Sequence, residues 1–340
     1  MAAPLVAIQK TGLVTSVGLT APAACAAIRA KLTNPGETRF IDSAGAPILA
    51  HQVPLDQPLR GIAKLVRMAA MAIEECLDDV PREQWGRIPL LLCVAERERT
   101  GRLDGMDDRL FLELESALGT RFPEDSAVIA RGRVGAAIAL AQARKLIHER
   151  RLPGVLIAAA DSLLNWPTLS HYERADRLLT ARNSNGFMPG EGAGAVLVTE
   201  PRGGRELLCT GLGFAMEKAF IDSGEPLRGD GLTAAVKAAL ADAGCQMHDL
   251  DFRVTDLSGE QYYFKEASLA LNRILRVRKE DFQLWHPAES HGEAGAASGM
   301  ACLVVAHMAA AKGYAPGRMG LLHFAADEGH RAALTIAGGH

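Results

Sequence analysis

The sequence predicts an α/β layered fold built from two similar halves. Apolar runs typical of strands alternate with longer runs in which apolar residues recur at helical spacing, the pattern of sheets covered by helices. The pattern starts again after a short polar, glycine-rich break at residues 199–204, TEPRGG. Because the order of elements is similar on both sides of this break, we predict two duplicated halves, residues 1–200 and 206–340, with a boundary near Pro201 to Glu206.

The first half contains five predicted strands. These short apolar runs cover residues 4–15, 88–95, 126–130, 154–161 and 193–200. Helices are predicted over residues 59–79 and 134–150, where apolar side chains recur at helical spacing. Residues 102–122 carry the same spacing beside many charges, and we expect this stripe to pack on the core rather than to face a partner.

The second half repeats the alternation. Strands are predicted at residues 206–216 and 249–259, and helices at residues 232–244 and 262–275. A second glycine-rich turn leads into a helix within residues 291–313. Residues 318–338 are predicted to form a closing pair of strands.

Composition is typical of a soluble globular protein. The chain has 340 residues, of which 48% are hydrophobic, and a net charge of -3, so it can bury a large core. It lacks both an apolar run of the ~18 residues that a membrane span needs and the charged start of a signal peptide, which predicts a cytoplasmic protein without a membrane span. Basic residues are interleaved with acidic ones, so no nucleic-acid partner is expected.

The cysteines show no metal-binding or disulfide pattern. They are scattered without a CxxC pair, and most lie in apolar surroundings such as residues 90–94 and 299–305. We therefore predict buried, reduced thiols, no metal site and no cofactor. The six are Cys25, Cys76, Cys93, Cys209, Cys245 and Cys302.

Residues 126–147 predict a strand that passes through a glycine-rich turn into an alanine-rich helix. Such a junction presents one side chain at a helix N-terminus, where backbone N–H groups and the helix dipole stabilise negative charge. The turn carries Arg131, Gly132 and Arg133, and no thiol or hydroxyl occurs between Val128 and Ile138. A junction suited to a nucleophile thus contains none.

Four stretches together resemble one enzyme family. They are residues 12–18 (GLVTSVG), 159–164 (AADSLL), 177–198 (RLLTARNSNGFMPGEGAGAVLV) and 292–306 (GEAGAASGMACLVVA). The chain resembles the β-ketoacyl-acyl-carrier-protein synthases of the thiolase superfamily, which act on acyl thioesters in fatty acid or polyketide biosynthesis. The resemblance implies a thiolase-like, five-layered α/β/α/β/α fold and dimerisation through strands of the first half. We expect the strand at residues 126–130 to lie centrally or at a two-fold interface, and residues 126–147 to lie close to the helix that begins near Gly295. Glu191, in the glycine-rich turn, is expected to be structural rather than catalytic.

The family's nucleophile is a cysteine at the strand-to-helix turn. Counting back from Asp161, which matches the polar end of the family's next strand, places Arg133 at that position. A guanidinium is permanently protonated and cannot attack a thioester. A shift of one or two positions offers no nucleophile either, since the neighbours are Arg131, Gly132, Val134 and Gly135.

The family's two histidines and its acyl gate are also altered. The segment expected to hold the first histidine, residues 254–266, has none, and Thr255, Asp256 or Ser258 takes the place. Gly292 occupies the position of the family's second histidine, and His291 precedes it by one residue. A loop shift would make His291 a remaining catalytic group; otherwise it is an N-cap or surface residue. The gate reads FAADEGH at residues 324–330, which adds Asp327 and Glu328. The candidate residues of the remnant pocket are Arg133, Asp256, Ser258, His291, Glu293 and Asp327.

Three classes of function follow from these changes. The first is a thiolase-fold subunit or adaptor without condensing activity, similar to chain-length-factor subunits and to the ketosynthase-like proteins found beside type VI secretion effectors. It implies a homodimer, or a heterodimer with a related subunit, that binds an effector protein or an acyl-carrier protein. The second is an enzyme without the usual cysteine, an acyltransferase of the 3-oxoacyl-acyl-carrier-protein synthase type, a thioester hydrolase or a decarboxylase, using His291 with Asp256 or Glu293.

The third class is a binding module for an acyl or carboxylate ligand. Arg131 or Arg133 beside a helix N-terminus suits an anion, although both arginines can equally pair with acidic residues across an interface. The chain is shorter than typical members of the family, and most of the missing length falls where loops would cover the acyl tunnel. We therefore expect an exposed pocket region.

Overall fold

One ten-stranded sheet runs through the molecule in this computed structural model, which describes residues 4–204 and 206–338. Its strands are β1 (Val6–Val14), β4 (Leu90–Val94), β5 (Ala127–Ala130), β6 (Val155–Ser162), β7 (Glu191–Thr199), β8 (Leu207–Met216), β9 (Phe252–Thr255), β10 (Leu284–Trp285), β11 (Met319–Ala325) and β12 (His330–Gly338). A separate hairpin is formed by β2 (Gly36–Ile41) and β3 (Pro47–Ala50).

Ten α-helices accompany the strands in the described residues. They are α1 (Ala21–Arg29), α2 (Gly61–Cys76), α3 (Arg82–Trp85), α4 (Arg109–Leu118), α5 (Gly135–Glu149), α6 (Trp166–Arg174), α7 (Asp230–Ala243), α8 (Gln261–Ile274), α9 (Ala288–His291) and α10 (Ala296–Ala311). Two 3₁₀ turns, η1 (Gly132–Val134) and η2 (Met247–Asp249), complete the elements. No helix of the described chain is long and apolar enough to cross a membrane.

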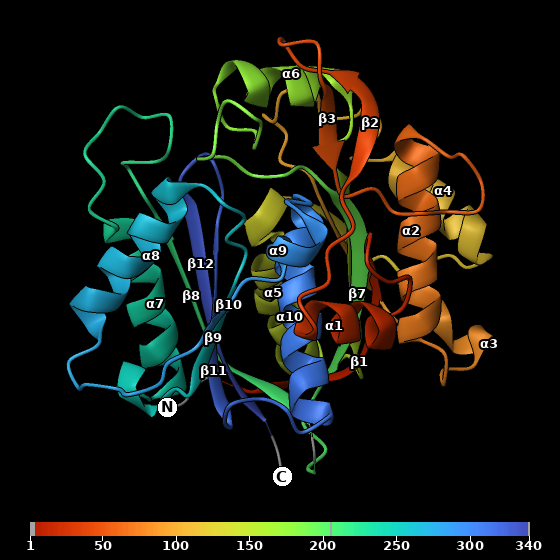
Figure 1. Cartoon of the computed structure of the whole chain (residues 1–340). Helices are drawn as coiled ribbons and strands as arrows, with labels where there is room; N and C mark the ends of the chain where they lie inside the picture. The colour runs from red at the N-terminus through yellow and green to blue at the C-terminus, as the bar shows by residue number, and fades with distance from the viewer. Residues whose placement is uncertain (1–3, 205, 339–340) are drawn as a thin grey trace.

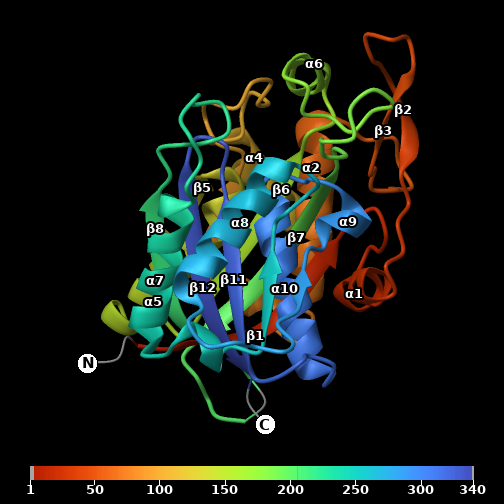
Figure 2. The same cartoon turned by 60° about the vertical axis from the view of Figure 1, so that its left-hand side comes forward.

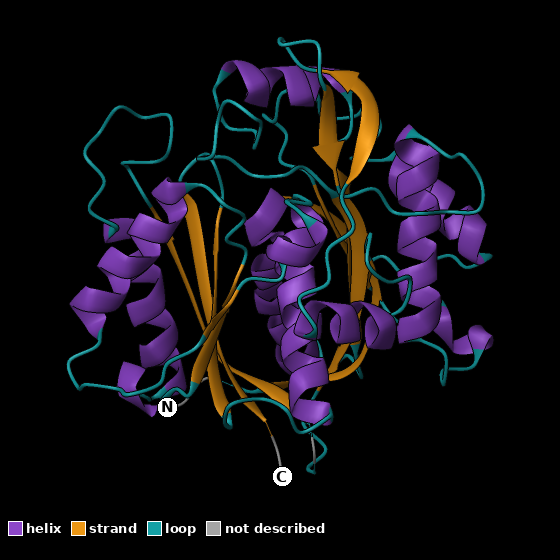
Figure 3. Ribbon diagram, in the orientation of Figure 1, coloured by secondary structure: helices purple, strands orange, loops and turns teal. Residues whose placement is uncertain are grey.

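Helices and sheet form five layers. Figure 1 shows α7 and α8 on one half of the sheet, α5 and α10 between the two halves, and α2 and α4 on the other half. The same layers stand out in Figure 3, where strands separate three groups of helices. The β2–β3 hairpin and α6 lie together above the layers in both Figure 1 and Figure 2. The predicted five-layered α/β/α/β/α architecture is therefore confirmed.

The two halves of the sheet share one strand order. From the outer edge inward, the strand order is β5-β4-β6-β7-β1 in the first half and β10-β9-β11-β12-β8 in the second. When the five strands of each half are numbered along the chain, both halves have the order 3-2-4-5-1. In each half the outer three strands are parallel, and the fifth is antiparallel to both neighbours. Residues 6–8 of β1 pair with residues 207–209 of β8 and join the halves. The repeated order supports duplication, and the division near residues 201–206 stays a prediction.

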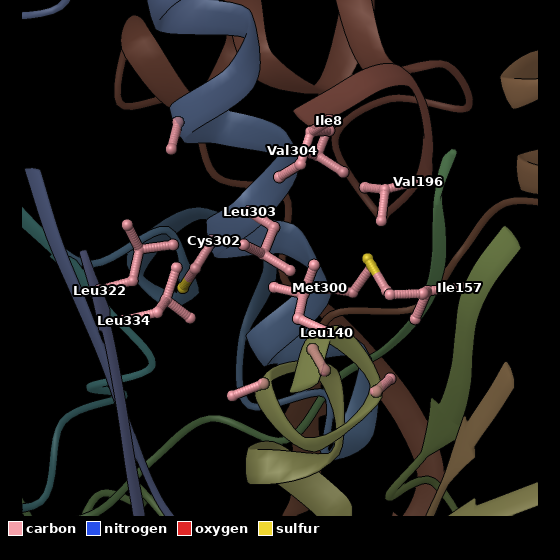
Figure 4. Packing of buried hydrophobic residues seen from close by; sticks show 14 of the residues in the cluster. Ile8, Leu140, Ile157, Val196, Met300, Cys302, Leu303, Val304, Leu322 and Leu334 are labelled. Carbon is pink, nitrogen blue, oxygen red and sulfur yellow. The ribbon is translucent and has the colours of Figure 1, made fainter. Parts of the chain in front are cut away.

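The central helix α10 explains why the layers stay together. Its sequence is apolar on all sides, and such a helix is stable only when it is buried all round. Figure 4 shows Cys302 directed toward Leu322 and Leu334 of one half-sheet, while Met300 packs toward Ile157 of the other. The helix thus forms one core with both halves of the sheet.

The predicted strands and helices of both halves are present. Residues 102–122 form a shorter helix, α4, which buries Leu110, Leu114 and Leu118 and confirms the core-packing interpretation. The β2–β3 hairpin and the helices α1, α3, α6 and α9 had no counterpart in the sequence prediction. One expectation was that the strand at residues 126–130 lies centrally or at a two-fold interface. The central position is wrong, because β5 is the edge strand of the sheet, pairing with β4 alone among the described strands.

The cysteines are reduced and almost all buried. Five are buried and Cys245 is half-buried, and none forms a disulfide. Burial raises the pKa of each thiol above its ordinary value, to about 12 for Cys25 and Cys209. The predicted buried thiols are confirmed for five of the six.

Several histidines are buried in the neutral form. Burial lowers the pKa of His51, His291 and His307 to about 4 and that of His323 to about 3. His291 is 1% exposed, and neither ring nitrogen has a hydrogen-bond partner in the described residues. Because the folded-state pKa lies below the unfolded value of 6.5, these histidines stabilise the fold above pH 6.5, and that stability is lost as the pH falls toward 4.

Replacing His291 should therefore reduce the acid sensitivity of the fold. Between about pH 7 and about pH 5.5, the free energy of unfolding of the wild type should fall by about 1 kcal/mol more than that of His291→Gln. Urea unfolding at the two pH values measures the difference. His248→Gln is the matched control for replacing a histidine by glutamine, since the His248 side chain is 43% exposed. Equal pH dependence in His291→Gln and the wild type would contradict the buried neutral state.

Candidate functional site

The turn between β5 and α5 places Arg133 inside the protein. The chain leaves β5 at Arg131, makes the 3₁₀ turn η1 and enters α5 at Gly135. Gly132 has a φ of 50°, and a Cβ there would overlap the Glu96 carboxylate, so this position requires glycine. Arg133 is only 8% exposed. The turn also packs against α10, since a Cβ at Gly299 would overlap the Arg133 carbonyl, and this confirms the expected closeness of the two glycine-rich turns.

Arg133 meets three acidic residues of the second half. Its guanidinium lies 2.5 Å from Asp327 Oδ1, 3.3 Å from Glu293 Oε2 and 3.9 Å from Asp256 Oδ2. It also donates to the Tyr263 hydroxyl at 2.8 Å and lies 4.6 Å from the centroid of that ring. Four of the six candidate residues, Arg133, Asp256, Glu293 and Asp327, are thus brought together.

A second arginine extends this cluster. Arg177 makes two hydrogen bonds with Glu260, at 2.7 and 2.9 Å, and donates to Asp327 Oδ2 at 2.8 Å. Tyr172 of α6 donates to Asp327 at 3.2 Å. We call the joined residues the arginine–acid network: Arg133, Arg177, Asp256, Glu260, Glu293 and Asp327, with Tyr172 and Tyr263.

Sequence reasoning missed Tyr172, Arg177, Glu260 and Tyr263. Arg177 begins the stretch 177–198 on which the family resemblance rests, and Tyr263 lies in the segment expected to hold a histidine. Glu260 and Tyr263 both lie at the start of α8, but no spacing rule links them to Tyr172 of α6 or to Arg177. Glu260 pairs with Arg177, and nothing in the sequence distinguishes this carboxylate from the many others.

A neighbouring ion pair ties β6 to α10. Arg99 makes a bidentate contact with Asp161, with distances of 2.7 Å and 2.6 Å, and both side chains are buried. Asp161 also accepts from the backbone N–H of Ala296 at 2.9 Å, at the first turn of α10, where the helix dipole favours a negative charge. Asp161 therefore has a positioning role at the start of the central helix.

Acidic groups outnumber guanidiniums around this region. Burial raises the pKa of Asp256, Glu260 and Glu293 more than the arginines lower it. Burial also raises the pKa of Glu96, to about 7. Asp327 differs: burial acts to raise its pKa, but Arg133 and Arg177 outweigh that effect and hold the pKa well below its ordinary range. Asp327 is thus the firmly ionised partner of both arginines.

The network fills most of the space beside the turn between β5 and α5. The cavity that remains is about 20 Å³, bordered by residues that include Arg99, Arg133, Arg177, Glu293 and Asp327. That volume holds about one water molecule, whereas small-molecule sites measure roughly 300–1,000 Å³. The expectation of an exposed pocket is wrong, because ion pairs and not loops close the site. Of the two interpretations of Arg133, pairing with acidic residues is the one observed.

Ser258 and His291 lie outside the arginine–acid network. The Ser258 hydroxyl is buried without a hydrogen-bond partner in the described residues. His291 ends the short helix α9 and is neither an N-cap nor a surface residue, which corrects the expectation. Burial and, to a smaller extent, His51 lower the pKa of His291, and no hydrogen bond in the described chain joins its ring to the side chain of Asp256 or Glu293. The proposed pairing of His291 with either acid is therefore not observed.

Two buried thiols lie near the turn between β5 and α5, and neither is reactive. Cys93 packs behind Gly135, at the first turn of α5, and Cys302 lies on α10 with 1% exposure. Burial raises the pKa of both thiols, so neither supplies the thiolate that attacks thioesters.

Glu191 has the structural role expected of it. The carboxylate accepts from the Val53 backbone N–H at 2.9 Å and from the Ser162 hydroxyl at 3.0 Å, and it pairs with Lys64. The side chain is buried and holds the loop before α2 against β7.

Comparison with known proteins establishes the fold. No family model matches the sequence, and no curated protein matches it. A chain of the AntDE:AntF complex, a type II polyketide synthase acyl-carrier protein with its ketosynthase, matches with a TM-score of 0.82 at 14% identity, covering 98% of this chain and 99% of that chain.

Two structures that include chain length factors are also similar. The ketosynthase ApeO with its chain length factor ApeC, from Xenorhabdus doucetiae, matches with a TM-score of 0.79 at 12% identity, covering 98% of each chain. The ishigamide ketosynthase/chain length factor matches with a TM-score of 0.75 at 18% identity, covering 99% of each chain. The protein therefore has the thiolase-like fold of ketosynthases and chain length factors over nearly its whole length.

Proposed function

We propose that this protein is a ketosynthase-like subunit without condensing activity that acts through a protein partner. The observation that carries the proposal is the burial of Arg133, at the turn where the family places its nucleophile, within an ion-pair network. A guanidinium cannot form an acyl intermediate, and the remaining cavity of about 20 Å³ cannot admit an acyl chain.

The partner we favour is a related thiolase-fold subunit. Two of the similar structures contain a ketosynthase with its chain length factor, a pairing of two related chains. The edge strand β5 supports this proposal, since the described chain leaves its outer side without a strand partner. An exposed edge can pair with a second chain and extend the sheet across a two-fold axis.

An effector of a type VI secretion system or an acyl-carrier protein is a further candidate partner. The effector rests on the sequence resemblance alone. The acyl-carrier protein has the additional support that one similar structure, AntDE:AntF, holds a ketosynthase with its carrier protein.

The alternative function is an acyltransferase or another thioester enzyme that works without the cysteine. It requires His291 beside Asp256 or Glu293 as a general base. The lack of any hydrogen bond between the His291 ring and these acids in the described residues weighs against it, as does the lack of space for a substrate.

Removal of the Arg133 charge should strongly destabilise the protein. Arg133→Met leaves the buried Glu293 without its cation and leaves Asp327 with Arg177 alone, and breaking a buried ion pair costs about 3–5 kcal/mol. Urea unfolding at neutral pH measures the loss. Arg131→Met, two residues away and exposed, should change stability by less than about 0.5 kcal/mol. If Arg133→Met is insoluble, Asp327→Asn provides the second measurement, and a loss below about 1 kcal/mol would contradict the network's structural role.

The purified protein should show no condensation of acyl with malonyl thioesters, measured by product mass spectrometry. Arg133→Cys should not restore activity, because residues 254–266 contain no histidine and the surrounding acids disfavour a thiolate. Thiol reagents should label no residue near Arg133 in the native protein. Turnover in the wild type that His291→Ala abolishes would instead favour the enzyme alternative.

The protein should form a dimer or a stoichiometric complex. Light scattering should give about twice the 36.2 kDa of one chain, or purification from the native host should recover a second subunit identified by mass spectrometry. Charge reversal at Arg133 or Asp327 does not test a contact directly, because both belong to the buried network. A lone 36.2 kDa species, together with a deletion that alters neither secretion nor lipid profiles, would contradict the proposal.

A further inference from the structure

A separate hollow lies between α1 of the first half and β10 and α10 of the second half. Its volume is about 240 Å³. Figure 2 shows α1 and α9 beside α10 on this face. The hollow shares no lining residue with the arginine–acid network. The lining residues on which the argument depends are Ile28, Arg29, Trp285, Glu289, Val305 and Tyr314.

The walls of the hollow are apolar and aromatic. Cys25 and Val305 are 3% and 4% exposed and form its buried floor. The rings of Trp285 and Tyr314 lie 6.3 Å apart between centroids at an angle of 32°. Burial of a ligand's apolar surface against these walls contributes about 25 cal/mol of binding free energy per Å².

A cation without an acidic partner stands at the rim. The Arg29 guanidinium lies 4.3 Å from the centroid of the Tyr314 ring, which holds it in place, and it makes no ion pair within residues 4–204 and 206–338. The one acid of the lining, Glu289, lies 3.9 Å from Lys31 and 3.7 Å from His286. Arg29 is therefore the uncompensated charge of the hollow, and it favours an anion.

The hydroxyl of Tyr314 adds a hydrogen-bond donor. It has no partner in the described part of the chain, and burial raises its pKa to about 12, so it stays protonated at neutral pH. An acceptor next to Arg29 can thus receive hydrogen bonds from a guanidinium and from a neutral hydroxyl.

We propose that this hollow binds a small apolar monocarboxylate, with its apolar body against Trp285 and Tyr314 and its carboxylate on Arg29. The volume corresponds to about eight water molecules, at roughly 30 Å³ each, and is smaller than the roughly 300–1,000 Å³ of drug-sized sites. It therefore suits a short acid such as octanoate rather than a long acyl chain. The site goes beyond the proposed function, and its ligand needs neither a protein partner nor condensing activity.

Calorimetric titration of the full-length protein with octanoate, 1-octanol and octylamine tests the assignment. We expect saturable 1:1 binding of octanoate, with 1-octanol bound about tenfold more weakly and octylamine more weakly still, because only the carboxylate uses the guanidinium. Octanoate should also change tryptophan fluorescence. In Trp285→Phe that optical change should largely disappear while calorimetric binding persists.

Arg29→Gln should weaken octanoate binding about tenfold and leave 1-octanol binding unchanged. Arg39→Gln is the matched control, because Arg39 is also exposed, stacks on an aromatic ring, that of Phe40, and makes no ion pair in the described residues. Equal affinity for octanoate, 1-octanol and octylamine, unsaturable binding, or a loss caused by Arg39→Gln instead of Arg29→Gln would overturn the proposal. None of these outcomes depends on whether a partner subunit exists.

Discussion

The buried guanidinium of Arg133 determines the arrangement of everything around it. A guanidinium cannot lose its proton, so a side chain that is 8% exposed must be surrounded by counter-charges and acceptors. Those acids come from three separate segments of the second half: Asp256 after β9, Glu293 before α10 and Asp327 in the β11–β12 turn. One side chain of the first half thus ties three segments of the second half to the turn between β5 and α5.

The ion pairs of the arginine–acid network fill the site but add little to the free energy of unfolding. The free-energy cost of removing two charges from water is about as large as the free energy gained from their attraction. A buried ion pair therefore contributes little net stability, although breaking it is strongly destabilising. Arg177 and Arg133 share Asp327, which keeps that carboxylate ionised, whereas Asp256 and Glu293 hold their protons more firmly because burial raises their pKa. The network therefore defines one closed arrangement and excludes a substrate-sized cavity.

The proposed function assigns the activity of this closed scaffold to its surface. The sheet that runs through the molecule ends at two edge strands, β5 and β10. The edge at β5 suits pairing with another chain. Near β10, the aromatic hollow beside Arg29 is an independent binding surface, in which the charge is left free and not consumed by internal pairing.

The sequence by itself determined the layered fold, the two glycine-rich turns and the lack of a nucleophile near Arg133, because hydrophobic periodicity and residue chemistry are local properties. It also indicated Asp256, Glu293 and Asp327 through the family resemblance. Only the tertiary structure showed that these acids surround Arg133, that Arg177 joins them and that the His291 ring forms no hydrogen bond with them in the described residues. Arg133 and Asp327 are 194 positions apart in the chain, and no local pattern encodes which of many carboxylates meets a given guanidinium. Which carboxylates contact Arg133 depends on how β5, α10 and the β11–β12 turn pack together. The tertiary structure also places β5 at the edge of the sheet. It closes the pocket that the length of the sequence had predicted to be open.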